Sequence, residues 1–207
     1  YTLRNPLYHW SQMELSRYFG IEELLHPSQA EKVYQATSEQ LQEEKFRARG
    51  LLEQMKVEVV CTTDDPADTL EHHEAYFNQN QSVKMYPAFR PDKSFAIENV
   101  STYKAYLQRL GQAAGVEITS FDTLLEALEN RVNFFHSRGC RLSDHGLENM
   151  YFSKITSLSP DQILKKVLEG TEPTDQEIIS FKFHALTALC KFYHAKGWGA
   201  AISLRST

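Results

Sequence analysis

The chain has 207 residues, of which 42% are hydrophobic and 24% are charged, and its formal net charge is −5. A chain of this length can bury one sizeable core or two small ones, and its composition excludes disorder, collagen and low-complexity sequence. Acidic and basic residues are interspersed. No basic stripe is therefore available to neutralise a phosphate backbone, and nucleic acid is not an expected partner.

The longest apolar runs are far shorter than the roughly 20 residues that a membrane-spanning helix needs, so no membrane partner is expected. The three cysteines, Cys61, Cys140 and Cys190, are widely spaced and form no CxxC pair. This pattern favours buried thiols in a reducing compartment, and we expect a cytoplasmic protein. The first residues contain neither an initiator Met nor a signal peptide, so we expect the chain to begin inside a longer protein.

The first quarter of the chain is predicted to be helical. Apolar side chains recur at helical spacing over residues 6–55, and Ser28 followed by Glu31 predicts a capping box at the start of a second helix. A β-branched run over residues 57–63 then predicts a strand. Asp65 is predicted to cap a helix that starts at Pro66.

The remainder of the chain alternates between predicted strands and helices. The predicted elements are a strand over residues 82–89, helices through residues 103–110 and 124–135, a strand over residues 140–143, helices from residues 159 and 174, and a strand over residues 198–204. Thr174 and Glu177 form a predicted capping box. Helices that separate short strands favour a parallel α/β architecture, but four strands cannot close an eight-stranded barrel.

Polar clusters follow three of the predicted strands, at residues 62–65, 90–93 and 143–145. Functional residues of parallel α/β proteins gather where the strands end. Helix caps and turns use the same residue types, so each cluster taken alone has a structural interpretation as well. The recurrence of polar clusters at three successive strand ends favours a site.

Two residues of these clusters are the candidates for chemistry. Arg90 can bind an anion through its planar guanidinium, or it can form a structural salt bridge with Asp64 or Asp92. Asp144 can serve as a general base or hydroxyl ligand, or it can cap the turn at Gly146. His145 beside it is expected to fill space.

No metal site is predicted within this chain. His72 and His73 are adjacent on a predicted helix, so their rings should face different directions. The other histidines lack the HxH or HxxxH spacing that brings two rings to one ion. Glycine-rich phosphate loops and nucleophile elbows are also absent from the sequence.

Four short motifs in this order resemble the glucuronate (uronate) isomerase family of the amidohydrolase superfamily. They are residues 5–10 (NPLYHW), 61–66 (CTTDDP), 90–93 (RPDK) and 143–146 (SDHG). The resemblance implies a distorted (β/α)8 TIM-type barrel with a helical insertion. Residues 1–56 would belong to the insertion, and residues 57–207 would form part of the barrel.

The resemblance also implies an activity and its residues. The family interconverts D-glucuronate with D-fructuronate, and D-galacturonate with D-tagaturonate, by proton transfer between C1 and C2 of a small sugar acid. Arg90 matches an arginine that helps to hold the substrate, and Asp144 matches an active-site aspartate. A divalent metal, zinc, is implied for the complete enzyme, but its HxH and late-strand Asp ligands have no counterpart in this chain.

One departure from the family pattern leaves alternatives open. Where the family has a His after the Gly-Trp pair, an ungapped match places Ser203. The alternatives are another sugar-acid enzyme of the superfamily, or a non-catalytic fragment or degenerate paralogue. We expect the 207-residue chain alone to be inactive because metal ligands are missing, and to associate, as a homo-oligomer for example, through uncovered strand edges.

Overall fold

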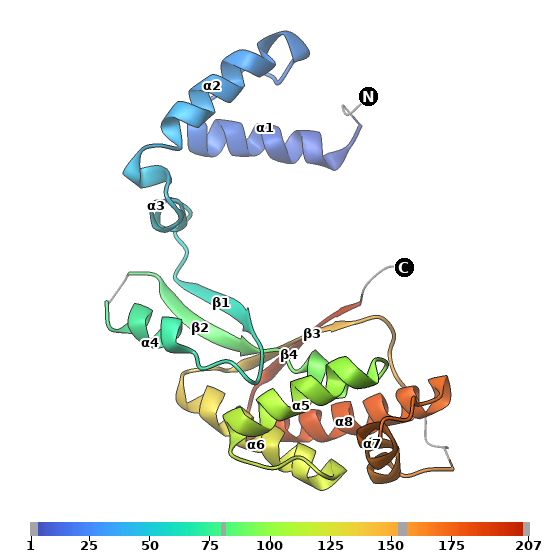
Figure 1. Ribbon diagram of the computed structural model, residues 1–207. Helices are drawn as coiled ribbons and strands as arrows, with labels where there is room; N and C mark the ends of the chain where they lie inside the picture. Colours follow the sequence, from blue (N-terminus) through green and yellow to red (C-terminus); the bar gives the residue numbers. More distant parts are fainter. Residues whose placement is uncertain (1–3, 80–81, 153–156, 205–207) are drawn as a thin grey trace. The chain divides into compact units, whose positions relative to one another are not determined.

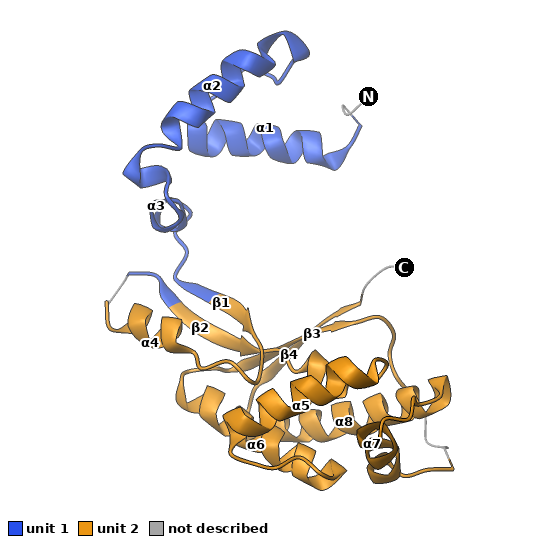
Figure 2. Cartoon of the chain, viewed as in Figure 1, with its two compact units in different colours: residues 1–60, 82–84 blue, residues 61–81, 85–207 orange. Residues whose placement is uncertain are grey.

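The structure of the chain is a computed structural model that describes residues 4–79, 82–152 and 157–204. It divides into two compact units, one of residues 1–60 and 82–84 and the other of residues 61–81 and 85–207 (Figure 2). The boundary crosses the first residues of two strands, β1 (Val59–Asp64) and β2 (Lys84–Phe89). The assignment of residues 1–56 to an insertion and of residues 57–207 to a barrel stays a prediction.

The first unit is built from short helices. Its α-helices are α1 (Pro6–Phe19), α2 (Ala30–Gln40) and α3 (Ala48–Gln54), joined by the 3₁₀ helices η1 (Pro27–Gln29) and η2 (Glu44–Phe46). Gly20 ends α1 in the left-handed conformation. Phe46 is buried and stacks on Phe19 at 5.2 Å between ring centroids. The predicted helical character of residues 6–55 is therefore confirmed, in three pieces.

The capping box predicted at Ser28 is wrong. Pro27 starts η1, and the residue that caps it is His26, whose side chain accepts the backbone N–H of Ser28. The helix α2 follows directly, and Gln29 at its N-cap makes no side-chain capping bond. Pro27 lies one residue before the predicted cap and occupies the first position of η1, so the first turn begins earlier than predicted, because proline suits the first position of a helix.

The second unit contains a four-stranded sheet in the order β1-β2-β3-β4. Its last two strands are β3 (Leu142–Leu147) and β4 (Gly199–Leu204). β3 pairs in parallel with β2 on one side and with β4 on the other. The predicted parallel α/β class is therefore confirmed.

Helices connect the strands of the second unit. They are α4 (Glu71–Phe77), the 3₁₀ helix η3 (Asp92–Phe95), α5 (Val100–Ala114), α6 (Phe121–Ser137), α7 (Pro160–Leu168) and α8 (Asp175–Lys196). In Figure 1, α5 to α8 lie on one side of the sheet. Within the described part of the chain, no helix is both long and apolar enough to cross a lipid bilayer.

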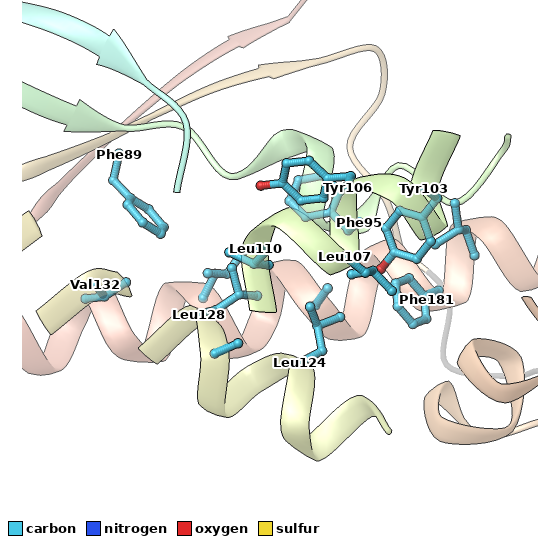
Figure 3. Close-up of a cluster of buried hydrophobic side chains, with 14 of the residues drawn as sticks. Phe89, Phe95, Tyr103, Tyr106, Leu107, Leu110, Leu124, Leu128, Val132 and Phe181 are labelled. Atoms are coloured by element: carbon cyan, nitrogen blue, oxygen red, sulfur yellow. The ribbon is translucent and has the colours of Figure 1, made fainter. Parts of the chain in front are cut away.

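The main core lies between the sheet and these helices (Figure 3). The side chains of Leu110, Leu128, Val132 and Phe181 are fully buried there. Burial of each such side chain stabilises the fold by about 1.5–3 kcal/mol relative to exposure. This core supports the strand ends that carry the polar clusters.

Helix boundaries in the second unit test the local predictions. The capping boxes at Ser159 and Thr174 are present, the latter closed by Glu177 as predicted. The helix predicted to start at Pro66 is wrong, because a turn closed by the hydrogen bond from Asp68 N–H to the Asp65 carbonyl follows β1 and α4 begins only at Glu71. Asp65 accepts the N–H of Ala67 through its side chain and so stabilises this turn.

The third strand is longer than predicted. A strand confined to residues 140–143 is wrong, since β3 runs from Leu142 to Leu147 and includes Asp144. Its burial alternates, with His145 and Leu147 buried and Asp144 partly exposed. Because successive side chains of a strand point to opposite faces, Asp144 and His145 lie on different faces of the sheet.

Candidate functional site

A cavity of about 510 Å³ lies at the ends of β1 and β2. It is lined by Thr63 and Asp64 of β1, by Arg90 and Asp92 after β2, and by Gly146 of β3. The loop after β1 and nearby helical residues add Asp65, Asp68, Lys93 and Arg109. Four aspartates thus face three cations, which makes the wall polar and slightly acidic.

Strand register brings Arg90 and Asp144 together. Phe89 of β2 is paired with Ser143 of β3, so the next residue along each strand is Arg90 and Asp144 respectively. The backbone N–H of Arg90 also donates to the carbonyl of Asp64, which ties the end of β2 to the end of β1. Arg90 and Asp144 thus lie on neighbouring strands, with Asp144 inside its strand and not at its end. Asp144 contacts Arg90 and Thr63 of the cavity wall, but it is not among the residues that line the cavity.

The side chain of Arg90 is held by two carboxylates. Its Nε donates to Asp92 Oδ2 at 3.2 Å, and its Nη1 lies 3.6 Å from Asp144 Oδ2. Nη2 has no partner among the residues that the structure describes. Of the two structural partners considered for Arg90, Asp92 is the one that pairs with it. This pairing leaves part of the guanidinium available to a ligand in the cavity.

Asp144 bridges two residues of the cavity wall. Its Oδ2 accepts the hydroxyl of Thr63 at 3.2 Å and faces Arg90 Nη1. The interpretation of Asp144 as a cap for a turn at Gly146 is wrong, because both residues belong to β3. About a quarter of the side chain is exposed, at 26%. Asp144 is therefore accessible and fixed in place, as a proton acceptor or hydroxyl ligand must be.

Asp92 is engaged by three neighbouring residues. Oδ2 accepts the N–H of Gly146 as well as Arg90 Nε, and Oδ1 lies 2.8 Å from His145 Nδ1. Burial alone would raise the pKa of Asp92, but the hydrogen bonds from His145, Gly146 and Arg90 together hold it below its ordinary value. Asp92 is therefore a stable anion that anchors its neighbours.

A second cluster surrounds Asp64. The hydroxyl of Thr62 donates to Asp64 Oδ2 at 2.6 Å and lies 2.7 Å from His73 Nε2. His73 is largely buried, whereas the neighbouring His72 is 92% exposed. The prediction that the two imidazoles face different directions is confirmed. Thr62 and His73 hold Asp64 in the wall of the cavity.

The outer part of the wall is a network around Asp65. Its carboxylate lies 3.2 Å from Lys93 Nζ and 3.1 Å from Arg109 Nη2, and it accepts the hydroxyl of Tyr106 at 3.1 Å. The Asp65 side chain is 11% exposed, whereas those of Lys93 and Arg109 are more than half exposed. Asp65 therefore holds two cations at the rim of the cavity.

The loop that carries Asp65 and Asp68 is held from behind by Arg131 of α6. Its guanidinium donates to the carbonyls of Pro66, Asp68 and Ala113 at 2.6, 2.8 and 2.9 Å. Burial lowers the pKa of Arg131 from its ordinary value, yet an arginine remains charged in proteins. The three bonds join the loop after β1 to the end of α5.

The described residues do not form a metal site. Among residues 4–79, 82–152 and 157–204, no group of three or more His, Cys, Asp or Glu side chains is placed to hold an ion. The carboxylates of the cavity wall are instead engaged by arginine, lysine, histidine and hydroxyl groups.

Sequence reasoning missed two parts of this site. His145 was expected to fill space, but it bonds to Asp92 and is only 1% exposed. Arg131 was not considered, because it lies in the middle of an apolar helical stripe far from any strand end. The one local signal was a charged residue at a buried helical position, which implies a fixed hydrogen-bonding role.

Comparisons with known proteins agree on one family. The family model described as glucuronate isomerase matches residues 1–207. The uronate isomerase of Flavobacterium johnsoniae is 44% identical over 198 residues, covering 96% of this chain and 42% of that protein. The uronate isomerase of Bacteroides thetaiotaomicron is 42% identical over 198 residues, with the same coverage of 96% and 42%.

Solved structures show the same relationship. The crystal structure of uronate isomerase from Thermotoga maritima superposes with a TM-score of 0.87 at 28% identity, covering 97% of this chain and 44% of that one. Glucuronate isomerase from Caulobacter crescentus gives a TM-score of 0.85 at 25% identity, with 97% and 42% covered. The chain thus spans less than half the length of these relatives, and it belongs to the glucuronate isomerase family.

Proposed function

We propose that this chain is the central part of a uronate isomerase. The complete protein would interconvert D-glucuronate and D-fructuronate, and D-galacturonate and D-tagaturonate, in the cytoplasm. The observation that carries the proposal is the pairing of Arg90, which lines the cavity, with Asp144 on the neighbouring strand, at the positions of two family motifs. The proposal includes a complete (β/α)8 barrel, of which the four strands here would form half.

The composition of the cavity wall suits a sugar acid with several hydroxyl groups. Aspartates accept hydrogen bonds from hydroxyls, and arginine and lysine donate to hydroxyl or carboxylate oxygens. Because four aspartates face three cations, the wall does not by itself favour an additional anion. The charge of the uronate would therefore be balanced in part by groups outside this chain, among which we include a divalent metal, zinc.

In the proposed reaction Asp144 removes the proton from C2 of the open-chain aldose. The oxygen on C1 gains a proton as the enediol forms. The hydroxyl on C2 then loses its proton to become the ketone while a proton is returned to C1, so the reaction is balanced without any oxidant or reductant. Arg90 would hold an oxygen of the substrate through Nη2 while its Nε stays on Asp92.

One observation favours a second candidate, a non-catalytic member of the family. Ser203 stands where the family pattern has a histidine, and in the sheet it is paired with Gly146 at the cavity. A serine cannot replace an imidazole as an acid, a base or a metal ligand. Under this second candidate, the chain would function as a binding or assembly module and not as an enzyme.

The test is isomerase activity of the complete protein, purified from a host without its own enzyme. Conversion of D-glucuronate to the ketose, followed by NMR, is the expected result. The 207-residue chain alone is expected to show none. A chimera of the Flavobacterium johnsoniae enzyme, carrying this chain in place of its matching 198 residues, isolates the contribution of these residues.

A folded complete protein without turnover would overturn the proposal. The second candidate predicts in addition that Ser203→His restores activity to an inactive chimera. An active chimera with Ser203 in place would instead show that the serine is compatible with catalysis. Association of copies, which we propose to involve the exposed β4 edge, is measured separately by sedimentation of the complete protein.

A further inference from the structure

Behind Arg90, a chain of hydrogen bonds runs from the cavity into the core. Asp92 is the first residue of η3 and lies two positions after Arg90. It meets His145 of β3 through Oδ1, and His145 Nε2 lies 3.2 Å from the hydroxyl of Tyr193 in α8. The residues thus come from three elements that are far apart in the sequence.

We propose that Asp92 is a positioning residue, held by His145 and Tyr193, that orients the guanidinium of Arg90 toward the sugar acid. This inference rests on the proposed function, because it names the residues that prepare Arg90 for its ligand. It assigns His145 and Tyr193 no contact with substrate.

His145 and Tyr193, at the inner end of this series of hydrogen bonds, are held in place by burial. His145 is 1% exposed and Tyr193 is 2% exposed. The Tyr193 ring stacks on Trp198, with centroids 5.9 Å apart and planes within 12°. Burial raises the pKa of Tyr193 well above its ordinary value, so its hydroxyl stays protonated and can donate.

The ionised carboxylate of Asp92 sets the direction of its own hydrogen bonds. Because it can only accept, the His145 ring donates its Nδ1–H to Asp92 Oδ1, and its Nε2 faces the Tyr193 hydroxyl. Asp92 Oδ2 remains for Arg90 Nε and the Gly146 N–H. The carboxylate therefore connects a rigid core to a side chain that is one-third exposed.

The benefit for binding is preorganisation. A long side chain loses about 0.5–1.5 kcal/mol when a ligand immobilises it, and prior fixation removes that cost from the binding step. A bond at Nε fixes the plane of the guanidinium and leaves the two terminal nitrogens to other partners. Because both oxygens of Asp92 are already engaged, it is better suited to hold Arg90 than to bind substrate.

The first test measures KM and kcat in the complete protein. Asp92→Asn keeps the shape but carries no negative charge, so the charge-assisted hydrogen bond from Arg90 Nε is weakened. We expect its KM to rise about tenfold with kcat within about threefold, as for loss of a binding interaction. Asp122→Asn, on the exposed surface of α6, is the matched control and should match wild type.

A pair of substitutions at His145 separates positioning from simple packing. The amide nitrogen of asparagine overlays Nδ1, so His145→Asn can still donate to Asp92. Glutamine places its donor near Nε2, so His145→Gln cannot. We expect His145→Gln to raise KM about tenfold and His145→Asn to stay within about threefold of wild type. Equal KM values for the two folded variants would overturn the proposal.

The second test needs no enzyme activity. In the complete protein, the Nε–H NMR signal of Arg90 should be sharp and protected from exchange, and Asp92→Asn and Tyr193→Phe should weaken that protection. Tyr8→Phe, which removes a hydroxyl bonded to Leu25 in the other unit, is the control. An unchanged Arg90 signal in Asp92→Asn refutes the positioning role. An inactive wild-type protein refutes only the proposed function.

Discussion

Replacement of Arg90 by lysine is the sharpest test of the candidate site, because it keeps the charge and removes the planar fork. Arg90 uses Nε for Asp92 at 3.2 Å and places Nη1 3.6 Å from Asp144, which leaves Nη2 for a ligand. A lysine has one ammonium group on a flexible chain. It cannot remain bound to Asp92 and also bind the sugar acid in the same geometry.

The expected loss is one charge-assisted hydrogen bond, about 1.5–3 kcal/mol, or roughly ten- to a hundredfold in kcat/KM. Most of the change should be a higher KM for the uronate. Steady-state kinetics of the complete protein provide the measurement. The control is Arg47→Lys, since the Arg47 side chain is 69% exposed and lies 3.4 Å from Glu44. If a folded Arg90→Lys variant had wild-type kinetic constants, Arg90 would not bind substrate, and its salt bridge with Asp92 would be purely structural.

Four further outcomes are expected. Asp144→Asn should lower kcat about a hundredfold or more with little change in KM, because an amide cannot accept the proton. Arg131→Met should lower the free energy of unfolding by about 3 kcal/mol in urea denaturation, because three carbonyls lose their donor. Gly139→Ala should cost at least about 1–2 kcal/mol in the same assay, because φ is +90° and the added Cβ would lie 2.7 Å from Tyr86. The pKa of Asp92 in the folded protein lies below its ordinary value of 3.8, so the ionised carboxylate stabilises the fold, and this stabilisation is complete at pH values above 3.8. This contribution is lost as the pH falls from there through the folded pKa, so the stability gap between wild type and Asp92→Asn should close in acid.

The candidate site could be predicted in part because strand ends are recognisable in the sequence. Arg90 follows a predicted strand that contains Val83, Tyr86 and Phe89, and parallel strands place their ends along one edge. The sequence did not reveal which carboxylate would meet Arg90. That choice depends on the register of β2 against β3, which pairs Phe89 with Ser143 across a separation of 54 residues (143 − 89).

The helix starts at Ser159 and Thr174, the end of α8 and the parallel α/β class were determined by the sequence itself. The capping boxes at Ser159 and Thr174 form because each needs only a side chain three residues away, and Gly197 ends α8 because glycine adopts the left-handed conformation at little cost. The order of strands and helices follows from apolar periodicity, which is also local. Such features depend on neighbours in the chain and are largely independent of the rest of the fold.

Tertiary structure alone decided the extent of β3 and the roles of His145 and Arg131. Residues 144–147 carry Asp, His and Gly, which favour turns, yet they form a strand because β4 pairs with them along their whole length. His145 is buried against α8 and forms a hydrogen bond with Asp92, a role that its position in the sequence does not indicate. Arg131 likewise binds three carbonyls from segments that are distant in the sequence. These contacts join residues 18 to 65 positions apart, so no local pattern encodes them, and only the packed chain brings the donors to their acceptors.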